Sequence, residues 1–169
     1  MFANNDLILV LTPSLAIMAL AAILIVAWLV QRPQRFLLWQ ACAYSLTAPA
    51  LVAQTLLSPE ELNRYALLIG SCYLLSAWCL AKSWAQRWCV STQPRVALLI
   101  AIVTLAALYQ FSQVEPNVWA RVSSFSVGSS LVLLLPILQV HSNKNSYDWL
   151  DKSLLWLSIL FTAYTFTRP

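Results

Sequence analysis

Residues able to do chemistry are scarce in this sequence, and those that stand out lie between positions 114 and 130. This stretch combines an acid, an indole, a base and several hydroxyls, a mixture that could bind a small polar ligand. The same residue types are also typical of the caps and interfacial anchors of membrane helices, so both roles stay open. The ligand candidates are Glu115, Trp119, Arg121, Ser123 and Ser126.

No group of residues predicts catalysis or metal binding. His141 is the only histidine, so one chain cannot supply paired axial haem ligands or a multi-histidine metal site. Cys72 and Cys79 lie seven residues apart on one expected helix, about 10 Å along its axis, which is too far for a disulfide. We therefore expect no catalytic residue, no metal and no cofactor in this chain.

The composition predicts an integral membrane protein. Of the 169 residues, 60% are hydrophobic and only 9% are charged, whereas soluble domains carry far more charge. Apolar runs recur that approach the roughly 20 residues needed to cross a bilayer, and backbone in lipid must be helical to satisfy its hydrogen bonds. We predict a single all-α domain over 1–169, an up-and-down bundle of six transmembrane helices with spans near 7–30, 36–57, 62–83, 96–113, 118–140 and 153–167.

The positions of Lys and Arg predict the orientation, because basic residues favour the cytoplasmic side. With the N-terminus outside, seven of the ten basic residues fall on inner loops and three on the outer side. We expect the N-terminus and Pro169 to lie on the outer side of the membrane, with the lipid bilayer as partner and no nucleic acid. The inner set is Arg32, Arg35, Lys82, Arg87, Arg95, Lys144 and Lys152, and the outer set is Arg64, Arg121 and Arg168.

Small residues predict where the helices touch. Lipid offers no hydrophobic drive between helices, so close approach depends on small side chains. The expected helices at 62–83 and 118–140 each combine a glycine with Ser or Cys, while Leu134 on the second is expected to face lipid. The predicted packing residues are Gly70, Cys72, Ser76, Ser124 and Gly128.

The middle of the first five expected spans holds no Asp, Glu, Lys or Arg. Ion-coupled transporters and proton pumps usually place such residues there, and transporters with broken helices usually show paired Gly/Pro interruptions. These features weigh against transport. A small permease and a membrane scaffold subunit nevertheless remain alternatives to a signalling role.

Several stretches together resemble a known family. They are QRPQR followed by LLWQACAYSL, then LAKSWAQRW, VEPNVWARVSSFSVGSSLVLL and YDWLDKSLLWLSILFTAYTFTRP. Their order is similar to that of the N-terminal multi-helix membrane sensor that precedes GGDEF domains in bacterial diguanylate cyclases. The residues that carry the resemblance lie at Trp39–Tyr44, Val114–Arg121 and Trp149–Trp156.

The resemblance implies an input domain in the bacterial inner (cytoplasmic) membrane, whose N-terminus and Pro169 would then face the periplasm. Its candidate partners are a homodimer formed through the parent protein and an unknown small ligand. The family's cytoplasmic GGDEF domain makes cyclic di-GMP from two GTP molecules. This chain has no GGDEF sequence and no Gly-rich phosphate loop, so catalytic residues cannot be carried over, and GTP and Mg²⁺ would belong to a further domain. We therefore expect the sequence to be a fragment of a longer sensor.

Overall fold

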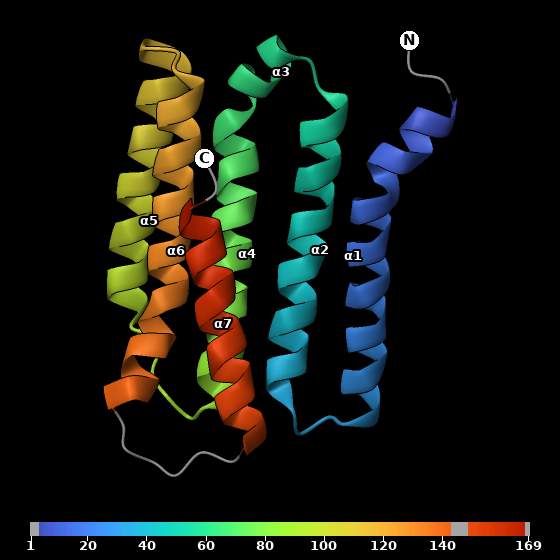
Figure 1. The fold of residues 1–169 in the computed structure, drawn as a ribbon, viewed down its shortest axis with the longest axis vertical. Helices are drawn as coiled ribbons and strands as arrows, with labels where there is room; N and C mark the ends of the chain where they lie inside the picture. Colours follow the sequence, from blue (N-terminus) through green and yellow to red (C-terminus); the bar gives the residue numbers. More distant parts are fainter. Residues whose placement is uncertain (1–3, 143–148, 168–169) are drawn as a thin grey trace.

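Every regular element in the described part of the chain is a helix, which confirms the all-α prediction. The computed structural model describes residues 4–142 and 149–167, with side chains described at 11–140, 149 and 151–164. The long helices run up and down beside one another (Figure 1). In chain order the elements are α1 (Asn4–Val30), α2 (Arg35–Leu56), α3 (Pro59–Arg64), α4 (Ala66–Arg87), α5 (Pro94–Tyr109), the π-helical turn η1 (Gln110–Val114), α6 (Val118–Ser142) and α7 (Trp149–Thr167).

Five helices are long and apolar enough to cross a membrane, which indicates membrane localisation. The sixth predicted span, near 153–167, falls on α7, and its crossing of the membrane stays a prediction. Lys144, Arg168, Pro169 and the side chain of His141 lie outside the described residues. The five candidate spans are Leu11–Val30, Arg35–Leu56, Ala66–Arg87, Pro94–Val114 and Val118–Val140.

A short helix, α3, occupies what we expected to be a plain connection and the start of the third span. It begins with a capping box, in which the Ser58 hydroxyl accepts a hydrogen bond from the Glu61 N–H. In return, the Glu61 carboxylate accepts one from the Ser58 N–H at 2.9 Å. The S-x-x-E pattern predicts such a helix start. Because α3 takes up these residues, α4 begins at Ala66 rather than near position 62.

The fourth span ends in the wide turn η1. The Glu115 N–H donates to the Gln110 carbonyl at 2.9 Å, an i to i+5 hydrogen bond that accommodates one residue more than an α-helical turn. The turn brings Gln113 to α3, where its side-chain amide donates to the Asn63 carbonyl at 2.7 Å. η1 therefore ties the end of α5 to the connection between α2 and α4.

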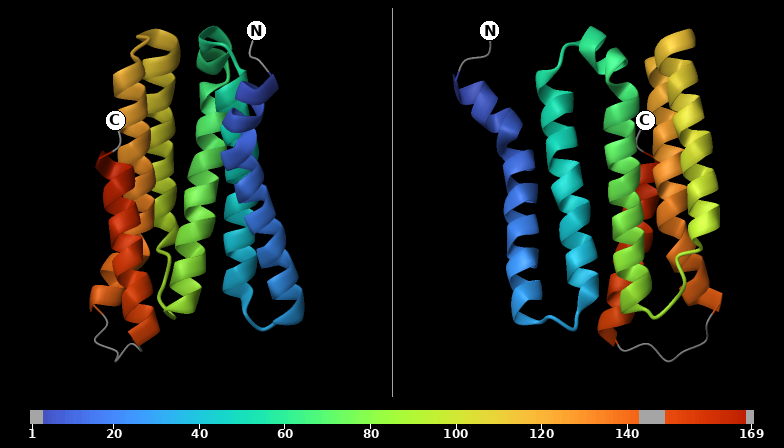
Figure 2. Two further views of the ribbon diagram at one scale, coloured as in Figure 1. Left: turned by 45° about the vertical axis from the view of Figure 1, so that its right-hand side comes forward. Right: turned by 180° about the vertical axis from the view of Figure 1, so that it is seen from behind.

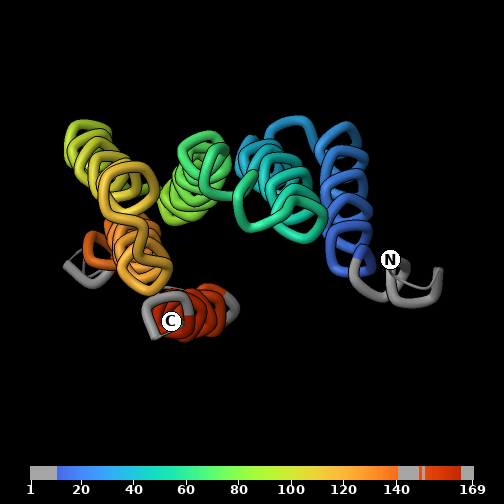
Figure 3. The backbone as a smooth tube through the Cα atoms, turned by 90° about the horizontal axis from the view of Figure 1, so that it is seen from above, coloured from blue at the N-terminus to red at the C-terminus, as the bar shows by residue number. Residues whose placement is uncertain are grey.

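The central helix is α4. It packs against α2 on one side and against α5 and α6 on the other, while α1 packs on α2 and α7 packs on α6. Figures 2 and 3 show α1, α2 and α4 following one another in a row that continues into α5 and α6. The peripheral helices expose large apolar side chains, as a lipid surrounding permits, including Leu15, Ile23 and Val26 on α1 and Leu98, Leu99 and Ile102 on α5.

Alanines provide the packing faces of α2. Ala41 and Ala48 are buried, as are Ala43 and Ala50, and at about 100° per residue the two pairs lie on nearly opposite sides of the helix. This placement explains how α2 fits between α1 and α4. The contact with α4 is reinforced by Ser76, whose hydroxyl donates to the Ala43 carbonyl at 2.9 Å and lies 2.6 Å from the Thr47 hydroxyl.

The predicted packing residues are buried to different degrees. Gly70, Ser76 and Gly128 are buried, whereas Cys72 and Ser124 are half-buried. Both glycines face α5, Gly70 opposite Leu108 and Gly128 opposite Thr104. Leu134 is half-buried rather than fully exposed to lipid, because α6 is covered by α4, α5 and α7.

Candidate functional site

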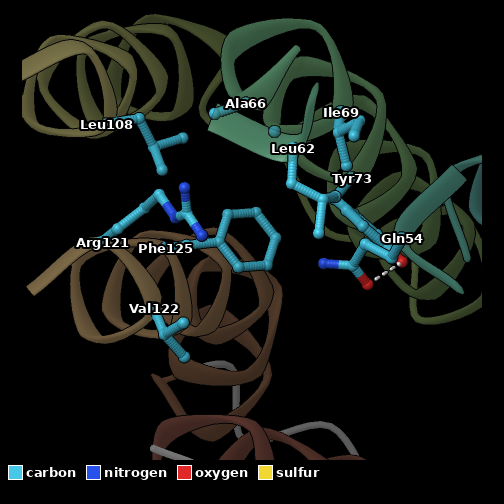
Figure 4. A pocket seen from close by; sticks show the side chains of 10 residues that line it. Gln54, Leu62, Ala66, Ile69, Tyr73, Leu108, Arg121, Val122 and Phe125 are labelled. Atoms are coloured by element: carbon cyan, nitrogen blue, oxygen red, sulfur yellow. Dashed lines mark hydrogen bonds between the residues drawn. The ribbon is translucent and has the colours of Figure 1, made fainter. Parts of the chain in front are cut away.

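A small pocket lies between α2, α4, α5 and α6 at the end of the bundle that carries α3, which we call the α3 end. Figure 4 shows the side chains that line it, which come from these helices and, for Leu62, from α3. Its volume is about 150 Å³. The lining is apolar apart from Gln54, the Tyr73 hydroxyl and Arg121, and it consists otherwise of Leu62, Ala66, Ile69, Gly70, Leu108, Val122 and Phe125.

Two aromatic rings and an amide form one side of the pocket. The rings of Tyr73 and Phe125 lie with centroids 5.5 Å apart and their planes tilted by 57°, a favourable arrangement for an aromatic pair. The Tyr73 hydroxyl donates to the side-chain carbonyl of Gln54 at 2.9 Å. This bond leaves the amide nitrogen of Gln54 directed toward the cavity (Figure 4).

Arg121 is the charged side chain of the lining. It is the fourth residue of α6, close to the positive end of the helix dipole, where cations are disfavoured and anions are stabilised. One guanidinium nitrogen donates to the side-chain carbonyl of Asn63, whose main-chain carbonyl accepts from Gln113. A guanidinium has five N–H donors, and Asn63 is its hydrogen-bond partner within the described residues.

No carboxylate neutralises Arg121 in the part of the chain that the structure describes, where the ion pair present joins Arg87 to Asp151. The acids of the α3 end, Glu60, Glu61 and Glu115, are exposed. Glu61 is engaged with Ser58 in the capping box. The pocket is therefore an apolar cavity with a positive charge and open hydrogen-bond donors on one wall, an arrangement that can bind an anion.

Of the five residues predicted to contact a ligand, Arg121 lines the pocket and the other four do not. Glu115 and Ser123 are exposed, as is Trp119 with 68% of its surface, while Ser126 is buried. The residues that sequence patterns did not reveal come from other helices, so no local spacing links them to Arg121. They are Gln54, Tyr73 and Phe125 in the lining, with Asn63 and Gln113 supporting Arg121.

Charged contacts join α2, α4 and α7 at the opposite end of the bundle. Arg87 pairs with Asp151 at 3.0 Å, and its guanidinium lies 5.4 Å from the centre of the Phe36 ring. Lys82 lies 4.2 Å from the centre of the Trp39 ring. The contacts thus connect three helices beside an open polar groove of about 500 Å³.

The described residues contain no group of three or more His, Cys, Asp or Glu that could hold a metal ion. The four cysteines Cys42, Cys72, Cys79 and Cys89 are free thiols. Comparison with protein-family models, curated proteins and solved structures gives no match. The case for a function therefore rests on the geometry of this chain.

We expect acid to weaken the capping box of α3, the helix that carries Asn63 to Arg121. Hydrogen bonds from the backbone N–H and the hydroxyl of Ser58 lower the pKa of Glu61. A group whose pKa is lowered on folding stabilises the folded form above its unfolded pKa, about 4.3 for Glu, and this effect is lost as pH falls through the folded pKa. Protection of the α3 amides against hydrogen exchange, corrected for intrinsic rates, should fall over that range.

The matched variants for this measurement are Glu61→Gln and Glu60→Gln. The first removes the titrating partner of Ser58, so α3 should lose protection at neutral pH and show little further change in acid. The second removes a neighbouring acid of the same helix and leaves the capping box intact. An acid-dependent loss of protection that persists in Glu61→Gln would show that the capping box is not its cause.

Proposed function

We propose that this chain is a membrane-embedded sensory domain that regulates an attached effector, a GGDEF diguanylate cyclase as in the family it resembles. The observation that carries the proposal is the pocket at the α3 end, which combines Arg121 with the Tyr73 and Phe125 rings. Ligand sites in helix bundles commonly lie between helices and combine an apolar wall with a few polar groups. A site of this kind supplies the input that a sensor requires.

The helix α4 offers a route from this pocket to the opposite end. Its first two turns contribute Ala66, Ile69 and Tyr73 to the lining, and its last turn holds Arg87 against α2 and α7. Small helix shifts at interfaces are an established form of signalling transition. A shift of α4 on ligand binding would change the contacts of Arg87 with Asp151 and Phe36.

The proposed orientation places the pocket on the periplasmic side of the bacterial inner membrane. Arg32, Arg35 and Arg95 lie at the connections of the opposite end, which supports a cytoplasmic location for that end. Reporter fusions at Met1 and at the loop following Arg87 provide the measurement. A cytoplasmic signal at Met1 together with a periplasmic signal at the loop would reverse the assignment.

The sensory proposal is tested on the full-length product of the gene, reconstituted in lipid vesicles. It is expected to make cyclic di-GMP from GTP, and Asp151→Asn is expected to change the rate because it cuts the link between α4 and α7. Lys152→Gln is the control, since it removes an adjacent exposed charge. A product without cyclase activity, or one that responds equally to both variants, would overturn the proposal, and solute uptake by the vesicles would favour a permease.

A further inference from the structure

We infer that the pocket at the α3 end binds a small organic monocarboxylate with a single ring or a short apolar chain. This assignment rests on the proposed sensory function for its biological role, because the acid would be the signal that the domain detects. Three features of the pocket, namely its charge, its volume and the nature of its walls, each narrow the ligand class.

The charge of the pocket selects an anion. Arg121 lies near the positive end of α6 with no neutralising carboxylate among the described residues, so a bound anion would gain from both the side chain and the helix dipole. The flat guanidinium matches a carboxylate through two parallel N–H···O bonds. Because Asn63 holds one nitrogen of Arg121, the group is already ordered before a ligand arrives.

The volume limits the ligand to a small one. The pocket is partly open, and its inner space of about 150 Å³ equals that of an enclosed engineered apolar cavity of about 150 Å³ that accommodates benzene. Its walls beyond Arg121 are the rings of Tyr73 and Phe125 with aliphatic side chains, apart from the neutral amide of Gln54, so most of the ligand body should be apolar. A second negative charge would find no second cation among the described lining residues, only the neutral amide of Gln54, and would carry a high desolvation cost, which disfavours dicarboxylates and nucleotides.

The carboxylate could reach the pocket from water or from the bilayer. Gln54 lies two residues before the end of one candidate span, and Arg121 lies three residues after the start of another, so the pocket is at the membrane boundary. A free acid such as benzoate and the head of a fatty acid present the same group to Arg121. Benzoate and palmitate, added separately to the protein in nanodiscs, distinguish these two sources.

The binding experiment is calorimetric titration of the purified chain in nanodiscs with benzoate. We expect saturable binding that falls at least tenfold in Arg121→Gln, and benzamide, the neutral isostere, should bind at least tenfold more weakly than benzoate. Arg64→Gln is the matched control, because it removes an exposed arginine of the same end outside the pocket and should bind like the wild type. Equal binding of benzoate and benzamide, or unchanged binding in Arg121→Gln, would overturn the inference.

A second variant keeps the test valid if Arg121→Gln does not fold. In Gly70→Ala the new methyl group would point at the end of the Leu108 side chain, 2.6 Å from Cδ1, and would reduce the cavity. This variant should weaken benzoate binding by more than acetate binding. If palmitate binds and depends on Arg121 while benzoate does not bind, the carboxylate chemistry holds but the small-acid assignment is wrong.

The outcomes for the ligand and for the sensory function are separable. If benzoate binds through Arg121 but does not change the rate of cyclic di-GMP synthesis by the full-length product, the sensory proposal is overturned. The ligand site would still stand. Conversely, a cyclase that responds to Asp151→Asn but binds none of the acids would overturn the ligand assignment alone.

Discussion

Replacing Gly128 by alanine should lower the free energy of unfolding by about 1–3 kcal/mol, the usual cost of overpacking, whereas Gly70→Ala should cost clearly less. A β-carbon at Gly128 would lie 2.6 Å from Cγ2 and 2.9 Å from Cβ of Thr104. Since Cβ moves only with the backbone, no rotation of the Thr104 side chain relieves the clash. The helices α5 and α6 would have to separate.

Comparison with Gly70→Ala tests whether the loss of stability in Gly128→Ala comes from the rigid contact with Thr104. There the added atom meets Cδ1 of Leu108 at 2.6 Å, while Cγ lies at an ordinary 3.9 Å, so rotation of the leucine end can make room. Thr104 has less freedom, because its hydroxyl donates to the Ile100 carbonyl at 2.7 Å. Both glycine variants can be compared by reversible unfolding in mixed micelles with increasing sodium dodecyl sulfate.

A companion variant checks that Thr104 is the obstacle. Thr104→Gly removes the clashing side chain, so the double variant with Gly128→Ala should lose less stability than the sum of the two single variants. Additive losses, or equal stability of Gly128→Ala and wild type, would mean that α5 and α6 do not meet at this position.

Replacing Leu133 by alanine should cost about 2 kcal/mol, at the lower end of the range for buried leucines. Leu133 is only 2% exposed and packs with Ala77, Ala81 and Val132 between α4 and α6. Because lipid is as apolar as leucine, the loss comes from the cavity and its missing van der Waals contacts rather than from exposure to water. The loss of unfolding free energy in Leu133→Ala should therefore be smaller than the loss at a comparably buried leucine of a soluble protein.

The control for Leu133 lies on the same helix. Leu138 is 62% exposed, so in Leu138→Ala lipid chains can occupy the vacated space, and the unfolding free energy should change by only a few tenths of a kcal/mol. The same detergent titration measures both variants. If Leu138→Ala lowered the unfolding free energy more than Leu133→Ala did, the face of α6 assigned to the interior of the bundle would be the one that contacts lipid.

The sequence predicts the helices of this protein well because a bilayer leaves the backbone no other choice. It predicts the buried faces poorly, since the lipid-facing and the internal sides of each helix are both apolar. Leu134 illustrates this difficulty, because its half-buried position on α6 depends on three neighbouring helices. The buried alanines of α2, such as Ala48, are likewise not among the predicted packing residues, although a methyl side chain also permits close packing.

The candidate site was predictable only in part, for a related reason. Arg121 stood out as the base of a stretch that also holds Glu115 and Trp119, but its surroundings depend on how distant segments meet. Asn63 reaches it from α3 and Gln54 closes the pocket from α2. The capping pattern at Ser58 was a local signal for α3, whereas nothing local connects Tyr73 with Phe125.

The wide turn η1 has a consequence for the evolution of this protein. A π-helical turn holds one residue more than an α-helical turn, so loss of one residue between Gln110 and Val114 could restore a regular helix without breaking the chain. The spacing of the remaining residues would then change from the five-residue to the four-residue hydrogen-bonding pattern, which would alter the direction of Gln113 relative to Asn63. Homologues that differ here by a single gap should therefore differ in how firmly Arg121 is held.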